Sequence, residues 1–271
     1  MNLTAHDGIP LAVEDHELPS PRARVLIVHG YAEHRGRYAE LTARLMAEGF
    51  ECHLFDLRGH GGSGGALAHV AQFSDYLEDL ALVVRHVRRD ARPLILVAHS
   101  LGGLIALAYV RRSGADVDAL AVSSPYLRPA FRVPAVKKGM AAVASRVAPT
   151  MKFASGLDPQ WLSHDERIVT AYATDPLVFR ITTPRWFIEV ERAQRELLDG
   201  AAEIRLPLLM QLGEEDRIAD HRRSIEVFRR IGSADKTLVP YAGLRHEIYN
   251  ELARDRVIDD LLAWLRSRTR A

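Results

Sequence analysis

Short runs of apolar residues alternate with longer segments of helical periodicity along most of the chain. Helical spacing is clear after Ser74, a residue that can cap a helix, and again around Ile258 near the C-terminus. Apolar strands separated by amphipathic helices predict a mostly parallel sheet that helices cover on both faces. The runs that we predict to be its strands are residues 25–28, 53–55, 94–98, 119–122, 206–212 and 237–239.

Two segments depart from this alternation. The first one forms the N-terminus, where two short strands are expected to meet at His6-Asp7-Gly8, because Asp-Gly favours a tight hairpin turn. The second one begins at Ser124, where roughly 75 residues of helical and irregular sequence are too long for an ordinary connection between strands. We therefore predict one domain over residues 1–271, with a cap inserted at about residues 125–198.

Composition limits the partners and the location that we expect. The 36 Lys and Arg residues nearly balance the 35 Asp and Glu residues, so no overall field favours nucleic acid, and we expect no nucleic-acid partner. The single cysteine, Cys52, can form no internal disulfide, which fits a reducing compartment. The N-terminus lacks a signal-peptide pattern, and no run approaches the ~20 apolar residues of a membrane span. These features favour a cytoplasmic location.

The residues with the clearest chemical meaning lie at the end of the predicted strand 94–98. There Ser100 stands between the small residues Ala98 and Gly102, and an apolar helical pattern follows. A serine at a sharp bend from strand to helix is typical of a hydrolase nucleophile, because the strained backbone pushes its hydroxyl outward. The usual motif has glycine at the position of Ala98, and the alternative role for Ser100 is a simple helix cap. We predict that Ser100 is a nucleophile.

A serine hydroxyl needs a base, and the base needs a group that orients it. Asp216 follows the predicted strand 206–212, with Glu215 and Asp220 as rival acids in the same loop. His246 follows the last predicted strand and precedes the terminal helix. The order Ser, Asp, His along the chain is the one expected for this arrangement of strands and helices. We predict that His246 takes the Ser100 proton and that Asp216 stabilises the imidazolium.

Backbone N–H groups are expected to stabilise the oxyanion that forms in such a reaction. The candidates are the N–H of Leu101, directly after the nucleophile, and the N–H of Tyr31, in the turn after the predicted strand 25–28. For His29, in the same turn, a structural hydrogen bond is the expected role. His29, Glu33 and His34 do not have the spacing of a metal-binding motif, so we expect neither a metal nor a cofactor.

These motifs together carry a family resemblance. The chain resembles the monoacylglycerol lipase and lysophospholipase branch of the α/β-hydrolases, also grouped as serine aminopeptidase S33. The likeness runs nearly end to end, and its matching segments are residues 29–38, 56–63, 98–103 and 172–177. It implies an α/β-hydrolase fold, with a mostly parallel eight-stranded sheet covered by helices on both faces and an inserted helical cap.

The resemblance also implies a polar end of the substrate site. In monoacylglycerol lipases, a glutamate and an arginine of the first segment and a tyrosine of the last one line the place of the glycerol group. That role falls here on Glu33, Arg37 and Tyr172. The alternative for Glu33 and Arg37, four residues apart, is a local ion pair. Mammalian members carry a histidine where this chain has Tyr249, so the glycerol contacts differ in detail.

The predicted cap is basic and apolar. Residues 119–157 contain no acidic residue, whereas cationic and apolar side chains are interspersed from Arg128 to Phe153. Such a segment fits peripheral contact with an anionic membrane surface. Packing of the apolar side onto the domain is the alternative, and the sequence leaves both open.

The function that the residues and the resemblance favour is hydrolysis of a monoacylglycerol, or a similar lipid-like single-chain ester, through an acyl-enzyme. A lysophospholipase or a general carboxylesterase with the same three residues is the alternative. A ligand-binding homologue without catalysis is an alternative of another class. The sequence leaves the oligomeric state and the acyl chain length open.

Overall fold

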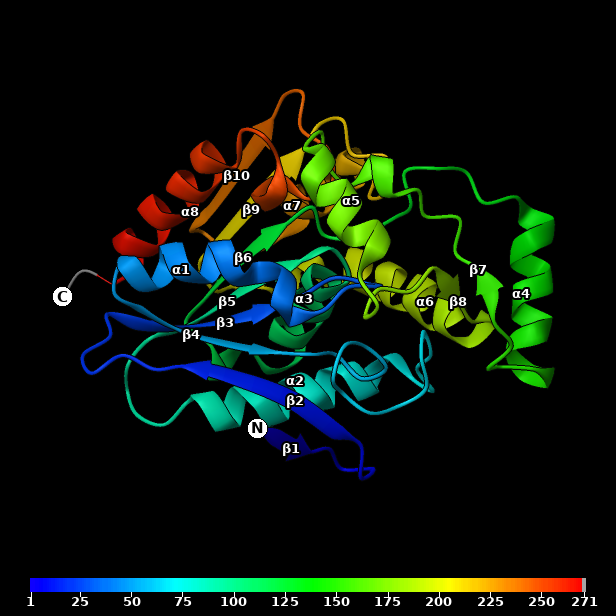
Figure 1. Cartoon of the computed structure of the whole chain (residues 1–271), viewed down its shortest axis with the longest axis horizontal. Coiled ribbons are helices and arrows are strands. Elements are labelled where there is room, and N and C mark those ends of the chain that lie inside the picture. Colours follow the sequence, from blue (N-terminus) through cyan, green and yellow to red (C-terminus); the bar gives the residue numbers. More distant parts are fainter. Residues whose placement is uncertain (270–271) are drawn as a thin grey trace.

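The computed structural model describes residues 1–269, so the last two residues of the predicted domain lie outside the described part. Eight strands form one sheet in the order β1-β2-β4-β3-β5-β6-β9-β10 (Figure 1). β1 and β2 pair antiparallel, β2 pairs antiparallel with β4, and all the other neighbours are parallel. The strands are β1 (Asn2–Thr4), β2 (Pro10–His16), β3 (Ala23–Val28), β4 (Phe50–Phe55), β5 (Leu94–His99), β6 (Ala119–Ser123), β9 (Leu208–Gly213) and β10 (Lys236–Tyr241).

Helices cover both faces of this sheet. One face carries α1 and α8, whose apolar residues pack in one core cluster, and the other face carries α2, α3, α6 and α7, which contribute to a second cluster. The bounds are α1 (Ala39–Ala47), α2 (Phe73–Val87), α3 (Ser100–Ser113), α4 (Ala135–Val147), α5 (Glu166–Thr174), α6 (Pro184–Gly200), α7 (His221–Arg230) and α8 (Arg254–Arg268). Short 3-10 helices are η1 (Arg35–Tyr38), η2 (Gly114–Asp116), η3 (Pro159–Trp161), η4 (Ala201–Glu203) and η5 (Ile248–Asn250).

The predicted fold class is confirmed. All six predicted strands are present, and each lies within a few residues of its expected bounds. The expected N-terminal hairpin is present as β1 and β2, and Gly8 in its turn has a φ of +83°, a conformation that glycine adopts without strain. The expectation that Ser74 caps a helix is wrong. α2 begins at Phe73, and the Asp75 carboxylate accepts a hydrogen bond from the Gln72 N–H, so Ser74 lies inside the first turn.

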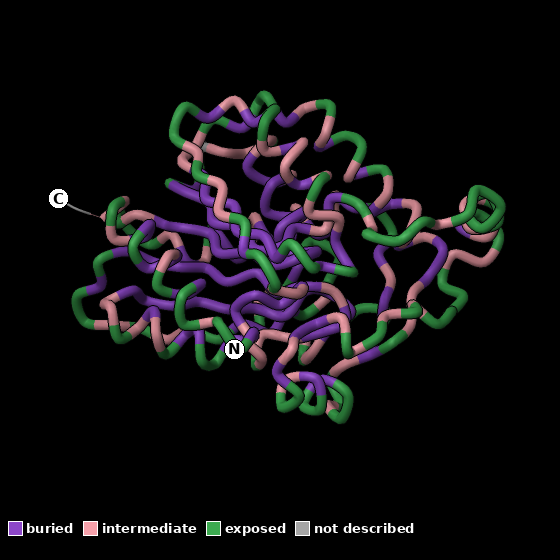
Figure 2. The backbone as a smooth tube through the Cα atoms, turned by 90° about the horizontal axis from the view of Figure 1, so that it is seen from above, coloured by how far each residue is buried: buried purple, intermediate pink, exposed green. Residues whose placement is uncertain are grey.

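The long segment between β6 and β9 contains α4, α5, α6 and a small antiparallel sheet of β7 (Phe153–Ala154) with β8 (Ile181–Thr182). We refer to residues 125–198 as the cap. α4 stands at the far right of Figure 1, and among the helices it contacts chiefly α6. Buried backbone concentrates in the sheet, whereas the outer cap is mostly exposed (Figure 2). Within residues 1–269, no helix combines the length and the apolar character that a membrane crossing requires.

Candidate active site

Ser100 lies at a strained bend where β5 passes directly into α3. Its φ is +51°, a left-handed conformation that costs a side-chain-bearing residue about 1–2 kcal/mol. Gly102 explains how the bend fits against β3. A Cβ atom at Gly102 would lie 2.3 Å from the Val28 carbonyl oxygen and 2.4 Å from that of His29. The glycine is therefore required by the close approach of α3 to β3, as the motif predicts.

The structure brings the three predicted catalytic side chains together. The His246 Nε2 atom is 2.9 Å from the Ser100 hydroxyl, and the His246 Nδ1 atom is 2.7 Å from the Asp216 carboxylate. The other oxygen of Asp216 accepts hydrogen bonds from the N–H groups of Ile218 and Ala219, each at 2.8 Å. These bonds hold the carboxylate in place, so an unbroken chain of hydrogen bonds links acid, base and hydroxyl.

Of the three candidate acids in the loop after β9, only Asp216 contacts His246 among the described residues. β9 ends at Gly213, and Asp216 is buried three residues later beside His246. The Glu215 side chain is more than half exposed, and Asp220 instead accepts hydrogen bonds from Arg128 and caps α7. Neither rival makes a hydrogen bond to His246 among the described residues.

The electrostatic environment favours a charged His246. Burial opposes its positive charge, but the Asp216 carboxylate outweighs this effect and raises the pKa of His246 above its usual value. His99 lies close by, with ring centroids 4.8 Å apart. Burial, together with the nearby His246, lowers the pKa of His99 to about 4. His99 is thus neutral near pH 7 and does not compete with the imidazolium for Asp216.

The two predicted oxyanion donors belong to segments that adjoin Ser100. Leu101 is the second residue of α3, so its N–H belongs to the first helical turn, which lacks carbonyl partners within the helix. Tyr31 follows Gly30, whose Cα lies so near the nucleophile that a Cβ there would be 3.1 Å from the Ser100 Cβ. His29 has the structural role expected of it. Its Nε2 atom accepts the Leu57 N–H at 2.9 Å, and its Nδ1 donates to the Gly30 carbonyl at 2.7 Å.

A buried polar cluster lies next to the hydroxyl. The Arg37 guanidinium donates to Glu33 at 2.9 Å and to both oxygens of Glu247, at 2.6 and 2.8 Å. The other Glu33 oxygen accepts the Gly30 N–H at 2.5 Å and the Tyr38 hydroxyl at 2.8 Å. The ion pair between Glu33 and Arg37 is therefore present, and it is part of a larger network.

Glu247 is the member of this cluster that sequence reasoning missed. Burial opposes its negative charge, but the Arg37 guanidinium outweighs this effect and lowers the pKa of Glu247 to about 2. The signal in the sequence was an acidic residue directly after the candidate base His246. Nothing in the sequence showed that Arg37, 210 residues away, would be its partner.

Tyr172 and Tyr249 are placed differently. The Arg37 guanidinium lies 4.8 Å above the Tyr172 ring, and the buried Tyr172 hydroxyl has no hydrogen-bond partner within residues 1–269. The Tyr249 hydroxyl donates to the Gln211 side chain at 2.7 Å, inside the core. Tyr172 therefore lies against Arg37 of the polar cluster, whereas the Tyr249 hydroxyl points into the core. Among the described residues, no cluster of His, Cys, Asp and Glu could hold a metal ion.

Comparison with known proteins decides the family. The family model described as serine aminopeptidase, S33 (Hydrolase_4) matches residues 19–253. The chain belongs to this family. It is 34% identical to a monoacylglycerol lipase of Mycolicibacterium smegmatis, over 90% of this chain and 88% of that protein. It is 29% identical to the human monoglyceride lipase, over 92% of this chain and 84% of that protein.

A solved structure agrees with this membership. The crystal structure of the Paleococcus ferrophilus monoacylglycerol lipase superposes with a TM-score of 0.89 and 28% sequence identity, over 95% of this chain and 99% of that one. The resemblance inferred from the motifs is thus confirmed, and so is the α/β-hydrolase fold.

Proposed function

We propose that this chain hydrolyses the ester bond of a monoacylglycerol, or of a similar single-chain lipid ester, to a fatty acid and an alcohol. The observation that carries the proposal is the hydrogen-bond chain from Ser100 through His246 to Asp216. The similarity to enzymes named monoacylglycerol lipase supports a carboxylic ester as substrate.

The proposed reaction has two steps, and no cofactor takes part in it. His246 removes the Ser100 proton while the oxygen attacks the ester carbonyl, and the N–H groups of Leu101 and Tyr31 stabilise the resulting oxyanion. The imidazolium then protonates the leaving alcohol, which departs as glycerol from an acyl-enzyme on Ser100. In the second step, water gives a proton to His246 and attacks the acyl carbonyl. Collapse releases the fatty acid, and the proton returns to Ser100.

We propose that the glycerol group lies at the buried polar cluster. Both Glu33 and Glu247 are already paired with Arg37, so they leave no free carboxylate for the ammonium group of a peptide substrate. The Tyr172 hydroxyl, by contrast, is buried and unpaired among the described residues, and leaving it so is costly. A hydroxyl group of the substrate is a suitable partner for it.

Tyr172→Phe tests this placement of the glycerol group. We expect kcat/KM for monoacylglycerol to fall about tenfold, because a hydrogen bond to the substrate is lost. Turnover of a p-nitrophenyl ester of the same chain length should be unchanged, because that substrate offers no hydroxyl. Initial rates on both substrates measure the effect. Tyr249→Phe is the matched control, since its hydroxyl points to Gln211, and we expect no change in the ratio of the two rates. Equal losses on both substrates for Tyr172→Phe would exclude the glycerol site.

A lysophospholipase with the same three catalytic residues remains the second candidate. The distinction lies in the preferred head group, which rates on matched monoacylglycerols and lysophospholipids measure directly. A cytoplasmic location and a single domain with its cap at residues 125–198 stay predictions.

We also propose peripheral contact between the cap and an anionic membrane. The large apolar side chains of α4 do not pack onto the domain, contrary to the alternative drawn from the sequence. Val136, Met140, Val143 and Val147 recur at helical spacing along one stripe, and they are 61–77% exposed. Lys137 and Arg146 of the same helix supply positive charge. An exposed apolar stripe flanked by cations fits an anionic lipid surface.

Val143→Glu is expected to weaken binding to vesicles that contain phosphatidylglycerol by about tenfold, because burial of one valine side chain in lipid contributes roughly 1.5–3 kcal/mol. Co-sedimentation with the vesicles measures this. Leu252→Glu is the control, since Leu252 is similarly exposed but lies two residues before α8, outside the cap. Equal binding by both variants would contradict the proposal.

A further inference from the structure

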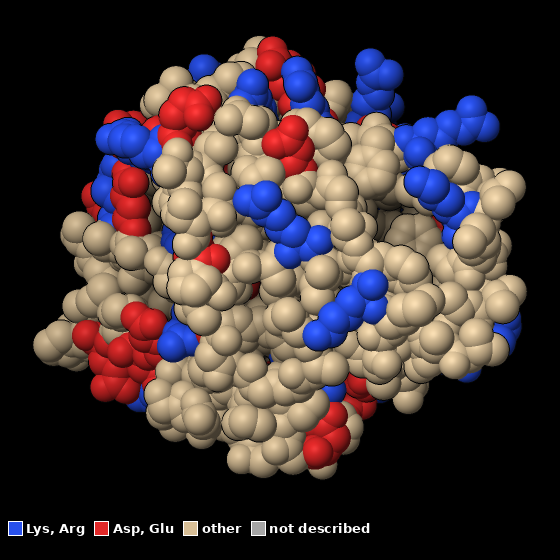
Figure 3. Space-filling model, turned by 45° about the vertical axis from the view of Figure 1, so that its right-hand side comes forward, with Lys and Arg blue, Asp and Glu red and all other residues tan. Residues whose placement is uncertain are grey.

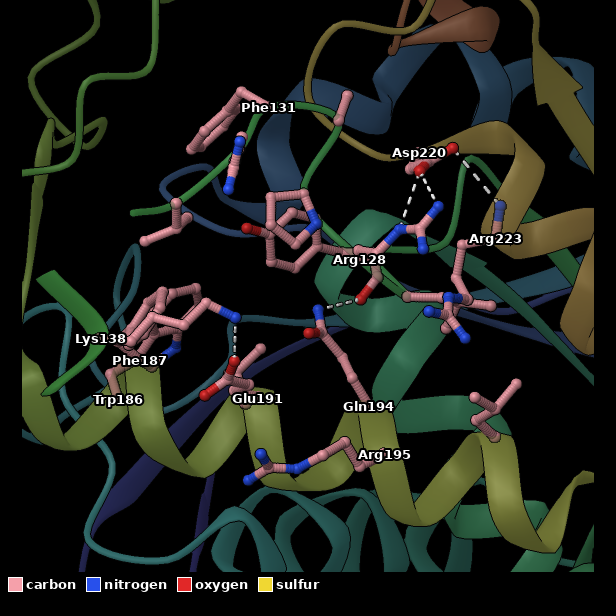
Figure 4. A pocket seen from close by; sticks show the side chains of 18 residues that line it. Arg128, Phe131, Lys138, Trp186, Phe187, Glu191, Gln194, Arg195, Asp220 and Arg223 are labelled. Carbon is pink, nitrogen blue, oxygen red and sulfur yellow. Dashed lines mark hydrogen bonds and ion pairs between the residues drawn. The ribbon is translucent and has the colours of Figure 1, made fainter. Parts of the chain in front are cut away.

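A cavity of about 570 Å³ lies between α6 of the cap and the start of α7. Its walls come from the segment 126–133, from Lys138 of α4, from one side of α6 and from α7, where Arg223 is located (Figure 4). Neither Ser100 nor His246 lines it. The cavity nevertheless adjoins the nucleophile, because the N–H of its wall residue Tyr126 donates to the Ser100 carbonyl oxygen at 2.9 Å.

The lining of this cavity is strongly basic. It contains five cationic side chains and two carboxylates, hence an excess of three positive charges, although the whole chain has a formal net charge of only +1. On the side of the molecule that carries the cap, Figure 3 shows Lys and Arg side chains around a hollow in the surface. The cations are Arg128, Arg132, Lys138, Arg195 and Arg223, and the carboxylates are Glu191 and Asp220.

Both carboxylates of the lining are already engaged. Asp220 accepts a hydrogen bond from the Arg128 Nε atom at 2.8 Å and a second one from the same guanidinium. Glu191 accepts a hydrogen bond from the Lys138 ammonium group. Two cations of the lining are thereby compensated, and three are not compensated by any carboxylate of the cavity.

The remaining cations lack full compensation. Within residues 1–269, Arg132 and Arg195 form no ion pair. Arg223 pairs only with Glu226, at 3.0 Å, and Glu226 also pairs with Arg230 at the same distance. The cavity therefore retains positive charge that no neighbouring group of the described chain neutralises.

Arg223 carries a second sign of a missing partner. Its Nε atom is buried and has no acceptor among the described residues. Figure 4 shows its side chain extending from α7 into the cavity, on the same side as Arg128. A buried guanidinium N–H without an acceptor is costly, and an anion in the cavity would accept its hydrogen bond.

Most of the remaining lining is apolar. Trp186, Phe187, Val190 and Leu198 of α6 face the same cavity as the arginines, and the Trp186 ring also stacks on Tyr31, at 4.0 Å between centroids. A purely inorganic anion would leave these side chains unused. The combination of apolar walls and free guanidinium groups fits a molecule that is apolar over most of its length and anionic at one point.

From this combination we propose that the cavity binds the anionic group of a single-chain amphiphile, which is either the phosphate of a lysophospholipid or the carboxylate of a fatty acid. A phosphate bound here would belong to a second class of ester substrate, and a carboxylate would belong to the product. The inference thus rests on the proposed ester hydrolysis for its biological meaning. Binding itself needs no turnover, so the two can fail separately.

The test measures equilibrium binding by calorimetry in the Ser100→Ala background, which prevents turnover. The probes are 1-decanoylglycerol 3-phosphate, decanoate and neutral 1-decanoylglycerol, each below its micelle concentration. Arg223→Gln is expected to weaken binding of at least one of the two anions by about tenfold, because a charge-assisted hydrogen bond is lost. Binding of 1-decanoylglycerol should not change.

Arg222→Gln is the matched control, because it removes the same charge from the neighbouring position of α7 but does not line the cavity. Arg195→Gln is a second test variant, because Arg195 is exposed and its replacement should not disturb folding. We expect it to weaken binding of the same anion. An effect on the phosphate ester alone identifies the lysophospholipid head group, an effect on decanoate alone identifies the fatty acid, and an effect on both supports a shared site.

This proposal would be overturned if Arg223→Gln and Arg222→Gln bound the two anions with equal affinity. It would also be overturned if Arg223→Gln weakened binding of neutral 1-decanoylglycerol as much as binding of the anions. Turnover of monoacylglycerol by the unmodified chain is measured in parallel. Turnover without Arg223-dependent binding refutes the anion site alone. Anion binding without any ester turnover refutes the proposed function and leaves the anion site standing.

Discussion

Ser100→Ala is expected to reduce the rate of monoacylglycerol hydrolysis by at least about 10⁴-fold, because it removes the only atom that forms the acyl-enzyme. The structural reason is the 2.9 Å contact between the hydroxyl and His246, which no other side chain of the described residues replaces. Initial rates on monoacylglycerols and p-nitrophenyl esters of matched chain length measure the loss. Covalent labelling with a fluorophosphonate reports the reactive hydroxyl independently, and Ser100→Ala should show no labelling.

Ser124→Ala is the matched control for this prediction. Ser124 is also a buried serine with a left-handed backbone, with a φ of +43° against +51° for Ser100. Its hydroxyl has no partner among the described residues, and it makes no contact with His246. Alanine keeps the Cβ atom at both positions, so both variants should unfold at nearly the temperature of the unmodified chain. Substantial esterase activity in folded Ser100→Ala would exclude Ser100 as the nucleophile.

Gly102→Ala is expected to destabilise the fold by about 3 kcal/mol and to abolish most of the activity, because the new methyl group collides with backbone. The added Cβ would lie 2.3 Å from the Val28 carbonyl oxygen. Because this oxygen is a backbone atom, the clash is relieved only if α3 moves away from β3. Since β3 leads into the turn of Tyr31 and α3 begins at Ser100, any shift also separates the nucleophile from the proposed oxyanion donor. Thermal and urea unfolding measure the stability.

Gly139→Ala is the control for the glycine. Gly139 lies in the middle of α4, and a Cβ there would meet no atom within 4 Å. Because glycine is a poor helix former, this variant should gain about 0.5–1 kcal/mol of stability. If Gly102→Ala were as stable and as active as Gly139→Ala, the close approach of α3 to β3 would not require a glycine at position 102.

Much of the fold was predictable because its signals are local. Apolar runs such as 94–98 identify buried strands, since both faces of a parallel sheet are covered and every position is apolar. The boundary of α2 was misplaced, because a helix start depends on which side chain reaches the first N–H groups, and Asp75 with Gln72 decided this.

The three proposed catalytic residues could be predicted for a similar reason. Each one follows a strand of the parallel sheet, so the carboxyl ends of β5, β9 and β10 bring Ser100, Asp216 and His246 to one edge. The motif around Ser100 indicated the candidate nucleophile, and chain order indicated the candidate acid and base. The sequence by itself thus determined the fold class, the family resemblance and the candidate triad.

Tertiary structure alone decided the features that depend on contacts between distant segments. Arg37 of η1 meets Glu247, which lies between β10 and η5, across 210 residues of chain, and no periodicity records that pairing. The stripe of α4 points away from the domain, although the same apolar spacing would serve for inward packing. The missing acceptor of the Arg223 Nε atom likewise follows from which oxygen atoms lie within reach. Local periodicity specifies an element and its apolar side, whereas partners across the fold are set by how the elements pack.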